Sequence, residues 1–144
     1  MASETKALRD AVVTAIAAWV PSPPATWPSF TPSAAWYLTD DLDAVSSLTV
    51  NVAPGTISGT PKTRRDIERT TRIAIQIVKK LASETEVDAL LELAERLDKF
   101  LYASCRSLAG FSLARTEIQT FDWKLLEGKR TFHTVLIATY LSLE

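Results

Sequence analysis

The sequence predicts an α+β fold, with a mixed or antiparallel sheet of about five strands, two main helices packed on one face, and a long loop between the second and third strands. Two segments carry most of this prediction. Between residues 67 and 80 isoleucines alternate with polar residues, which is the pattern of a strand with one buried face. Between residues 87 and 101 leucines recur at helical spacing. We expect a single domain covering residues 1–144.

Length and composition agree with one globular domain. A chain of 144 residues buries roughly two-thirds of the surface that it exposes when unfolded. It is 47% hydrophobic and 23% charged, with a net charge of -1, which argues against a general affinity for nucleic acid or anionic membranes. The single cysteine, Cys105, and the lack of zinc-type spacing predict a reducing compartment without a structural metal. We expect neither a signal segment nor a transmembrane helix.

The first predicted element is an amphipathic helix over residues 3–20, with Ser3 as its N-cap. Its apolar positions follow helical spacing: Leu8, Val12, Ile16 and Trp19. A Pro-rich connector follows over residues 21–32, because prolines exclude a helix there. This connector is expected to pack Trp27 and Phe30 across the surface of the domain.

The next segments predict strands. Residues 34–39 are rich in aromatic residues and residues 47–53 alternate, so the two suit an antiparallel hairpin around the turn DDLD. A polar loop with proline and glycine is expected from Ala53 to Arg64. The third strand then follows, with Ile67, Ile73, Ile75 and Ile77 on one face and Arg72, Gln76 and Lys80 on the other.

The second helix begins, by prediction, at a capping box in which Ser83 accepts an amide proton and Glu86 reaches back. Its apolar stripe is Val87, Leu90, Leu91, Ala94, Leu97 and Leu101. The helix should end between Tyr102 and Gly110. Two further strands are predicted from Phe111 and from Arg130, joined by a short turn.

Groups with catalytic or metal-binding chemistry are few and poorly placed. The only histidine, His133, lies within a predicted strand and has no nucleophile motif elsewhere in the sequence. Cys105 follows a helix beside Arg106 and is either an activated thiol or, as is commoner, a small buried apolar residue. The aspartates at 40, 41 and 43 lack a calcium motif, and PGTISGT lacks the Lys-Ser/Thr pair of a phosphate loop. We therefore expect no enzymatic activity, no cofactor and no metal.

Binding is the better expectation, and the segment from residue 53 to residue 72 is its best candidate. Within it, five basic residues outnumber Asp66 and Glu68, giving a local charge of +3. Nucleic acid is one partner that such a charge would suit, but the segment has no interleaved aromatic residues, which favours a solvated strand end or a contact with a protein partner. The candidate contact residues are Ile57, Lys62, Arg64, Arg65, Arg69 and Arg72. One or two of the four tryptophans, Trp19, Trp27, Trp36 and Trp123, are also expected at an interface.

A family resemblance rests on several of these segments. They are the run V-x-V-x-P at Val50, Val52 and Pro54, the loop ending in Arg64-Arg65, the strand RTTRIAIQIVKKL, the helix EVDALLELAERLDKFL and the last strand TFHTVLIATYL. In this order, from Val50 to Leu141, they resemble tail terminator and neck (head-tail joining) proteins of long-tailed bacteriophages. The Pro-rich segment has no counterpart in that family.

The resemblance implies a non-enzymatic subunit of a ring, often a hexamer, at the head-proximal end of the virion tail, assembled in the host cytoplasm. Such a ring caps the tail tube, ends tail elongation and joins the head-tail connector. Its implied partners are other copies of the chain, the tail tube protein and the head completion protein, while DNA passes through the lumen without sequence-specific binding. The alternatives are a head closure or adaptor protein of the same virion and a cytoplasmic nucleic-acid-binding module.

Overall fold

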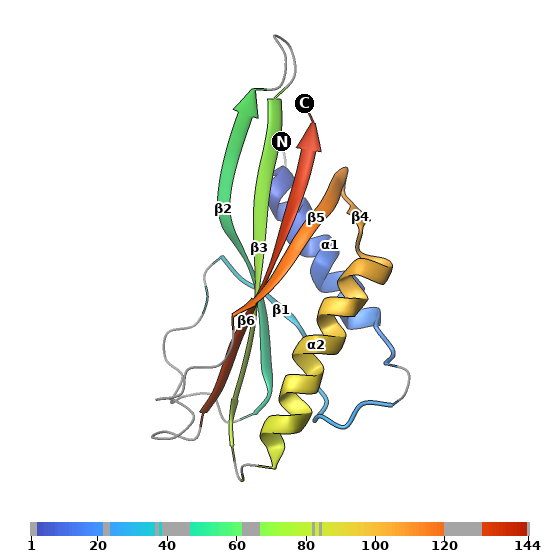
Figure 1. Cartoon of the computed structure of the whole chain (residues 1–144), viewed down its shortest axis with the longest axis vertical. Helices are drawn as coiled ribbons and strands as arrows, with labels where there is room; N and C mark the ends of the chain where they lie inside the picture. Colours follow the sequence, from blue (N-terminus) through green and yellow to red (C-terminus); the bar gives the residue numbers. More distant parts are fainter. Residues whose placement is uncertain are drawn as a thin grey trace.

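The computed structural model describes residues 3–21, 24–36, 38, 47–61, 67–81, 83, 85–119 and 131–143. It confirms the α+β class: within these residues a twisted mixed sheet of six strands carries two helices (Figure 1). The elements are α1 (Glu4–Ala18), β1 (Ser33–Ala34), β2 (Thr49–Pro61), β3 (Ile67–Lys80), α2 (Glu86–Ser104), β4 (Ser107–Leu108), β5 (Phe111–Gln119) and β6 (Thr131–Leu143). The strand order is β1-β2-β3-β6-β5-β4, and β4 is a strand that the sequence did not predict.

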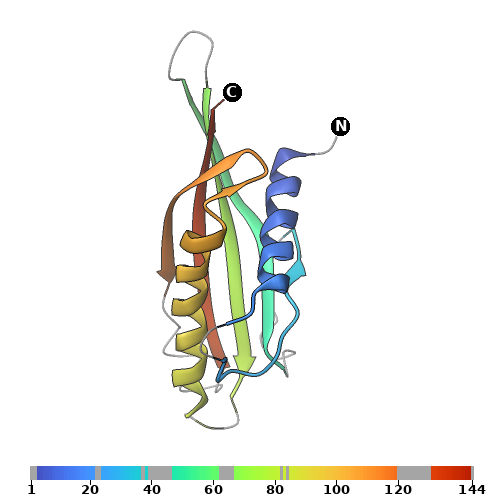
Figure 2. The ribbon, with the colours of Figure 1, turned by 90° about the vertical axis from the view of Figure 1, so that its right-hand side faces the viewer.

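The two helices lie side by side on one face of the sheet (Figure 2). The predicted N-cap of α1 is confirmed, because Ser3 Oγ accepts a hydrogen bond from the backbone N–H of Lys6 at 3.3 Å. The helix ends at Ala18, shortly before Pro21, which disfavours helical geometry in the residue that precedes it. Its stripe of Leu8, Val12 and Ile16 is buried in the core.

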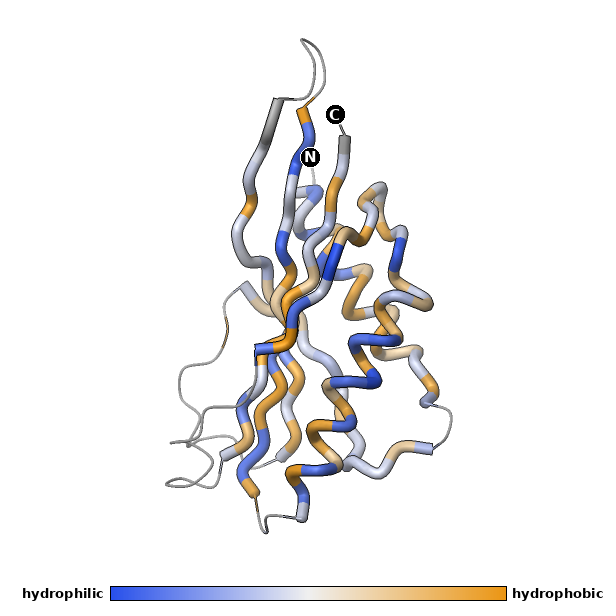
Figure 3. The backbone as a smooth tube through the Cα atoms, viewed as in Figure 1, coloured by the Kyte–Doolittle hydropathy of each residue, from blue (hydrophilic) through white to orange (hydrophobic). Residues whose placement is uncertain are grey.

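The core lies between the helices and the three long strands β2, β3 and β6, which pair antiparallel. The predicted alternation in β3 is confirmed for Ile73, Ile75 and Ile77, all fully buried on the helix side. Gln76 and Val78, which point to the opposite face, are buried as well. The expectation that β3 buries only one face is therefore wrong. In the backbone tube coloured by hydropathy, hydrophobic residues are most frequent where the strands lie beside the helices (Figure 3).

The predicted antiparallel hairpin of residues 34–39 and 47–53 is wrong. Strand β1 covers only two residues and pairs with β2 in parallel, with Ser33 opposite Asn51 and Ala34 opposite Val52. A parallel pair needs a connection of about a dozen residues or more, and residues 35–48 are long enough to supply it. The predicted turn DDLD lies outside the described residues.

The predicted loop from Ala53 to Arg64 is wrong over most of its length, because β2 continues to Pro61. A bulge between Pro54 and Ile57 absorbs the Pro-Gly pair and lets the strand continue. Proline is tolerated there because, among the described residues, β1 pairs with β2 only at Asn51 and Val52, so no β1 ladder bond is needed at Pro54. Residues 62–66 lie outside the described part of the chain.

The helix α2 confirms most of the predicted apolar stripe, but not the predicted capping box. Leu90, Ala94, Leu97 and Leu101 are buried, whereas Leu91 is only partly buried, and the buried Leu93 was missing from the predicted stripe. The N-cap is Thr85 rather than Ser83, and the Thr85 side chain makes no capping bond. The Ser83 hydroxyl instead contacts the Thr85 hydroxyl at 2.7 Å, and the Glu86 carboxylate accepts a hydrogen bond from Lys79 at 3.1 Å. The two acids in the first turn, Glu86 and Asp88, favour the helix through its dipole.

The strands predicted from Phe111 and from Arg130 are confirmed as β5 and β6, while residues 120–130 between them lie outside the described part. A tight hairpin joins β4 to β5. Its two central residues, Ala109 and Gly110, both have positive φ, at 50° and 83°, which is the backbone of a type I′ turn. Glycine adopts it freely, whereas Ala109 is strained there.

Candidate assembly surface

The most prominent surface feature is the distal hairpin, which we define as residues 55–61 of β2 and 67–72 of β3. It extends past the N-terminal end of α1 in two perpendicular views (Figures 1 and 2). Its tube is mostly neutral or hydrophilic (Figure 3), yet two isoleucines interrupt this character. Ile57 is 51% exposed and Ile67 is 48% exposed, so the distal hairpin presents apolar side chains to its surroundings.

Both isoleucines lie on the helix side of the sheet. Ile57 is opposite Thr71 and Ile67 is opposite Pro61, which places them on the same face as the buried Ile73. The sequence pattern assigned Ile67 to the buried set, and its face is correct, but six residues of strand carry it about 20 Å from Ile73. That distance takes it beyond the cover of the helices and leaves its side chain 48% exposed.

No strand in the described part of the chain pairs with the outer edge of β2 over the same length. Among the described residues, β1 pairs only with Asn51 and Val52, and Ala35 N–H donates to the Val52 carbonyl at 2.8 Å. Residues 53–61 carry no charged side chain, although edge strands are usually protected by charge. The opposite edge is covered, because β4 pairs with β5 and the Tyr102 hydroxyl accepts the Thr116 N–H at 3.0 Å.

Two of the predicted contact residues lie on different faces. Arg69 lies on the helix side and forms an ion pair with Glu4 at 3.4 Å, joining the distal hairpin to the first turn of α1. Both side chains are exposed, so this pair contributes about 0–1 kcal/mol. Arg72 lies on the opposite face and is exposed. Lys62, Arg64 and Arg65 lie outside the described residues, so their role stays a prediction.

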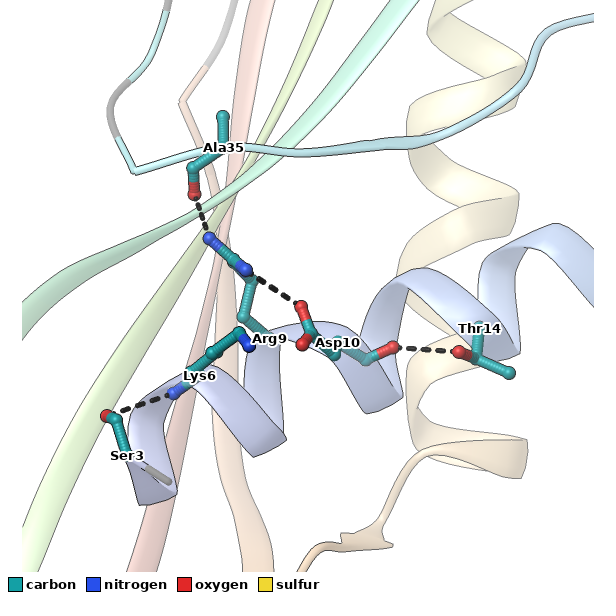
Figure 4. Close-up of polar contacts among 6 residues, drawn as sticks. All are labelled: Ser3, Lys6, Arg9, Asp10, Thr14 and Ala35. Atoms are coloured by element: carbon teal, nitrogen blue, oxygen red, sulfur yellow. Dashed lines mark hydrogen bonds and ion pairs between the residues drawn. The ribbon is translucent and has the colours of Figure 1, made fainter. Parts of the chain in front are cut away.

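A buried arginine anchors the start of the open edge (Figure 4). Arg9 of α1 donates to the Ala35 carbonyl at 3.0 Å and, through Nε and Nη2, to the Asp10 carboxylate at 3.0 and 2.9 Å. Its guanidinium also lies 4.2 Å from the ring centre of Trp36. The contact therefore holds the end of β1 against α1, and it supports a tryptophan that is 58% exposed.

The other described tryptophans belong to the packing of the domain. Trp19 stacks between Trp27 and Phe100, with ring centroids 5.8 and 5.1 Å apart, and Arg96 lies 5.1 Å from the ring of Trp27. The connector thus packs Trp27 onto the domain as predicted, and buries it. Trp36 is the exposed tryptophan of the described part, and Trp123 lies outside that part.

The groups with catalytic potential are held in structural roles. Cys105 is buried, and burial raises its thiol pKa to about 11, which argues against an activated thiol. Its carbonyl accepts a hydrogen bond from the Tyr140 hydroxyl at 2.9 Å. Burial likewise raises the pKa of Tyr140, and the nearby Cys105 adds to the rise.

Three polar side chains form a ladder across the sheet face opposite the helices. Asn51 donates to Gln76 at 3.3 Å, and the Gln76 amide nitrogen lies 2.9 Å from Nε2 of His133. Because that amide nitrogen can only donate, His133 Nε2 is the acceptor and the ring carries its proton on Nδ1. The only histidine of the chain, His133, is therefore hydrogen-bonded within the sheet.

The described residues contain neither a cluster suited to a metal ion nor a helix suited to a bilayer. They contain no group of three or more histidine, cysteine, aspartate or glutamate side chains arranged to hold a metal ion, and Asp40, Asp41 and Asp43 lie outside them. Neither described helix has the length and apolar character needed to cross a bilayer. Comparison of the sequence with models of known protein families and with curated proteins gives no match.

Proposed function

We propose that this chain is a structural virion protein of the tail terminator type, a ring-forming subunit that caps the tail tube, ends tail elongation and joins the tail to the head connector. The observation that carries the proposal is the distal hairpin, which extends past the helices with two exposed isoleucines and an uncharged open edge. Exposed apolar side chains at the end of a projecting element are typical of an assembly contact.

A closed ring with head-to-tail contacts needs two different faces on each subunit. The distal hairpin provides one of them and docks on a different surface of the neighbouring subunit or of the adjoining ring. The burial of Cys105 and the ladder that holds His133 support a structural rather than a catalytic role. The proposed partners are other copies of the chain, the tail tube protein and the head completion protein.

The variant Ile57→Asp tests this proposal. It places a charge at the exposed apolar contact without touching the core, so we expect folded subunits that no longer form rings in negative stain or light scattering. Val20→Asp is the matched control, because Val20 is 84% exposed at the opposite end of α1 and its substitution should leave the rings intact. If subunits with Ile57→Asp still form rings and join tails to heads, the distal hairpin is not part of the assembly contact.

A second measurement separates a terminator from other neck proteins. Tails assembled without a terminator should vary in length, because nothing stops the tube from growing. Tails of normal, uniform length that fail only to join heads would instead favour a head closure or adaptor protein. The two results are read directly from electron micrographs of tails made in the absence of this chain.

A further inference from the structure

Two arginines that are far apart in the sequence share one row of the sheet. Thr139 of β6 is opposite Arg72 of β3 on one side and opposite Arg115 of β5 on the other. Directly opposite residues in antiparallel strands point to the same face, so all three point away from the helices. Two strand spacings separate the arginines, which places their Cα atoms about 10 Å apart.

Both arginines are exposed. Neither side chain has a hydrogen-bond or ion-pair partner within the part of the chain that the structure describes. The nearest acid along β5 is Glu117, which lies on the same face opposite Ile137 and forms no ion pair with Arg115. The two guanidinium groups place two positive charges in one row with a threonine between them, while Glu117 and Glu68 lie on the same face farther along β5 and β3.

The bulge in β2 keeps space beside Arg72. A Cβ atom at Gly55 would lie 3.2 Å from the Arg72 carbonyl oxygen and 3.4 Å from its Cβ, so any larger residue would crowd the base of this side chain. Because their Cα atoms lie about 10 Å apart, both arginine side chains are long enough to reach one ligand above Thr139.

We propose that the Arg72–Thr139–Arg115 row binds the phosphodiester backbone of nucleic acid. Guanidinium groups match phosphate oxygens with paired hydrogen bonds. None of the described aromatic side chains of β2, β3, β5 and β6 lies on this face: Phe111, Phe132 and Tyr140 are all buried in the core. Within the described part of these strands, the face therefore offers no phenylalanine, tyrosine or tryptophan ring on which bases could stack. The proposed contact is to the backbone and independent of sequence.

This inference rests on the proposed function for its setting, because a tail-end ring surrounds the DNA that leaves the head. Each subunit then contributes two phosphate contacts. Two contacts give a weak interaction that depends strongly on salt: the affinity should fall about tenfold between about 50 mM and about 200 mM salt. Weak contacts of this kind guide DNA without holding it.

The test is fluorescence anisotropy of a short random-sequence DNA duplex with the full-length chain. At about 50 mM salt, we expect the double variant Arg72→Gln with Arg115→Gln to weaken binding at least about tenfold, and each single variant to reduce the salt slope by about one. Arg106→Gln is the matched control, since this exposed arginine lies between α2 and β4, and it should change binding less than about twofold. Inorganic phosphate should compete with the duplex.

Three results would overturn the proposal: no binding of the duplex, equal binding by the double variant, or stronger competition by polyglutamate than by a polyphosphate of equal charge, which would indicate an acidic protein partner. Binding of free phosphate without binding of the duplex would also overturn it. Ring formation is measured separately on the same variants. A double variant that forms normal rings but has lost DNA affinity supports the inference. If the unsubstituted chain binds the duplex but forms no rings, the result counts only against the proposed function.

Discussion

The buried Arg9 gives a sharp prediction about stability. The variant Arg9→Met keeps most of the apolar stem but removes the hydrogen bond to the Ala35 carbonyl and the contact with the Trp36 ring. A hydrogen bond from a charged donor contributes about 1.5–3 kcal/mol, and an exposed cation–π contact contributes about 0.5–1 kcal/mol. The ion pair with Asp10 adds little, because that carboxylate is half exposed. The expected loss is about 2–4 kcal/mol of unfolding free energy.

Urea unfolding measures this loss as a drop of about 1–2 M in the midpoint. Lys6→Met is the control, since it removes the same charge from an exposed position of the same helix and should change stability by less than about 0.5 kcal/mol. Hydrogen exchange adds a local readout: the Ala35 N–H, bonded to Val52, should exchange faster in Arg9→Met. Equal midpoints for the two variants, with unchanged exchange at Ala35, would refute the anchoring role of Arg9.

Three further predictions follow from single positions. Ala109→Gly removes the strain of a positive φ in the β4–β5 turn and should raise the unfolding free energy by about 1 kcal/mol in urea; a decrease would contradict the type I′ turn. Gly55→Ala should lower the melting temperature, because the added Cβ meets the Arg72 carbonyl at 3.2 Å. An unchanged melting temperature would mean that the β3 backbone shifts away from the new Cβ at little cost. Because burial raises the Cys105 pKa from 9.0 to about 11, the native thiol stays protonated where the unfolded thiol ionises. Stability that is fully present below pH 9 is therefore lost as the pH rises toward about 11, and Cys105→Ala should flatten that decline in pH-dependent unfolding.

The predictions that succeeded depend on local patterns, and those that failed depend on pairing between distant segments. The alternation at Ile73, Ile75 and Ile77 and the stripe of α2 are visible in the sequence because each element buries its own face. The parallel direction of β1 is not visible, because nothing in residues 33–34 specifies a partner. Pro54 and Gly55 are typical of a loop, yet an edge strand with a bulge accommodates both.

The candidate surfaces show the same division. The exposure of Ile57 follows from its place in the projecting hairpin, which the sequence indicated as a polar loop. The row that joins Arg72 to Arg115 could not be predicted, because it exists only through the register of β3, β6 and β5. A bulge between Leu113 and Arg115 also changes the face on which the later residues of β5 lie, and the sequence carries no clear signal for it.

The polar ladder across the sheet has a consequence for how firmly its strands are aligned. A slip of one residue between strands moves every side chain to the other face, and it would break the hydrogen bonds that join Asn51, Gln76 and His133. The ladder therefore fixes the alignment of β2, β3 and β6 near the core. In the distal hairpin, β2 has the glycines Gly55 and Gly59 and small polar residues, a composition that specifies register weakly. The strands of this hairpin can adjust their twist against a neighbouring protein while the core keeps its register.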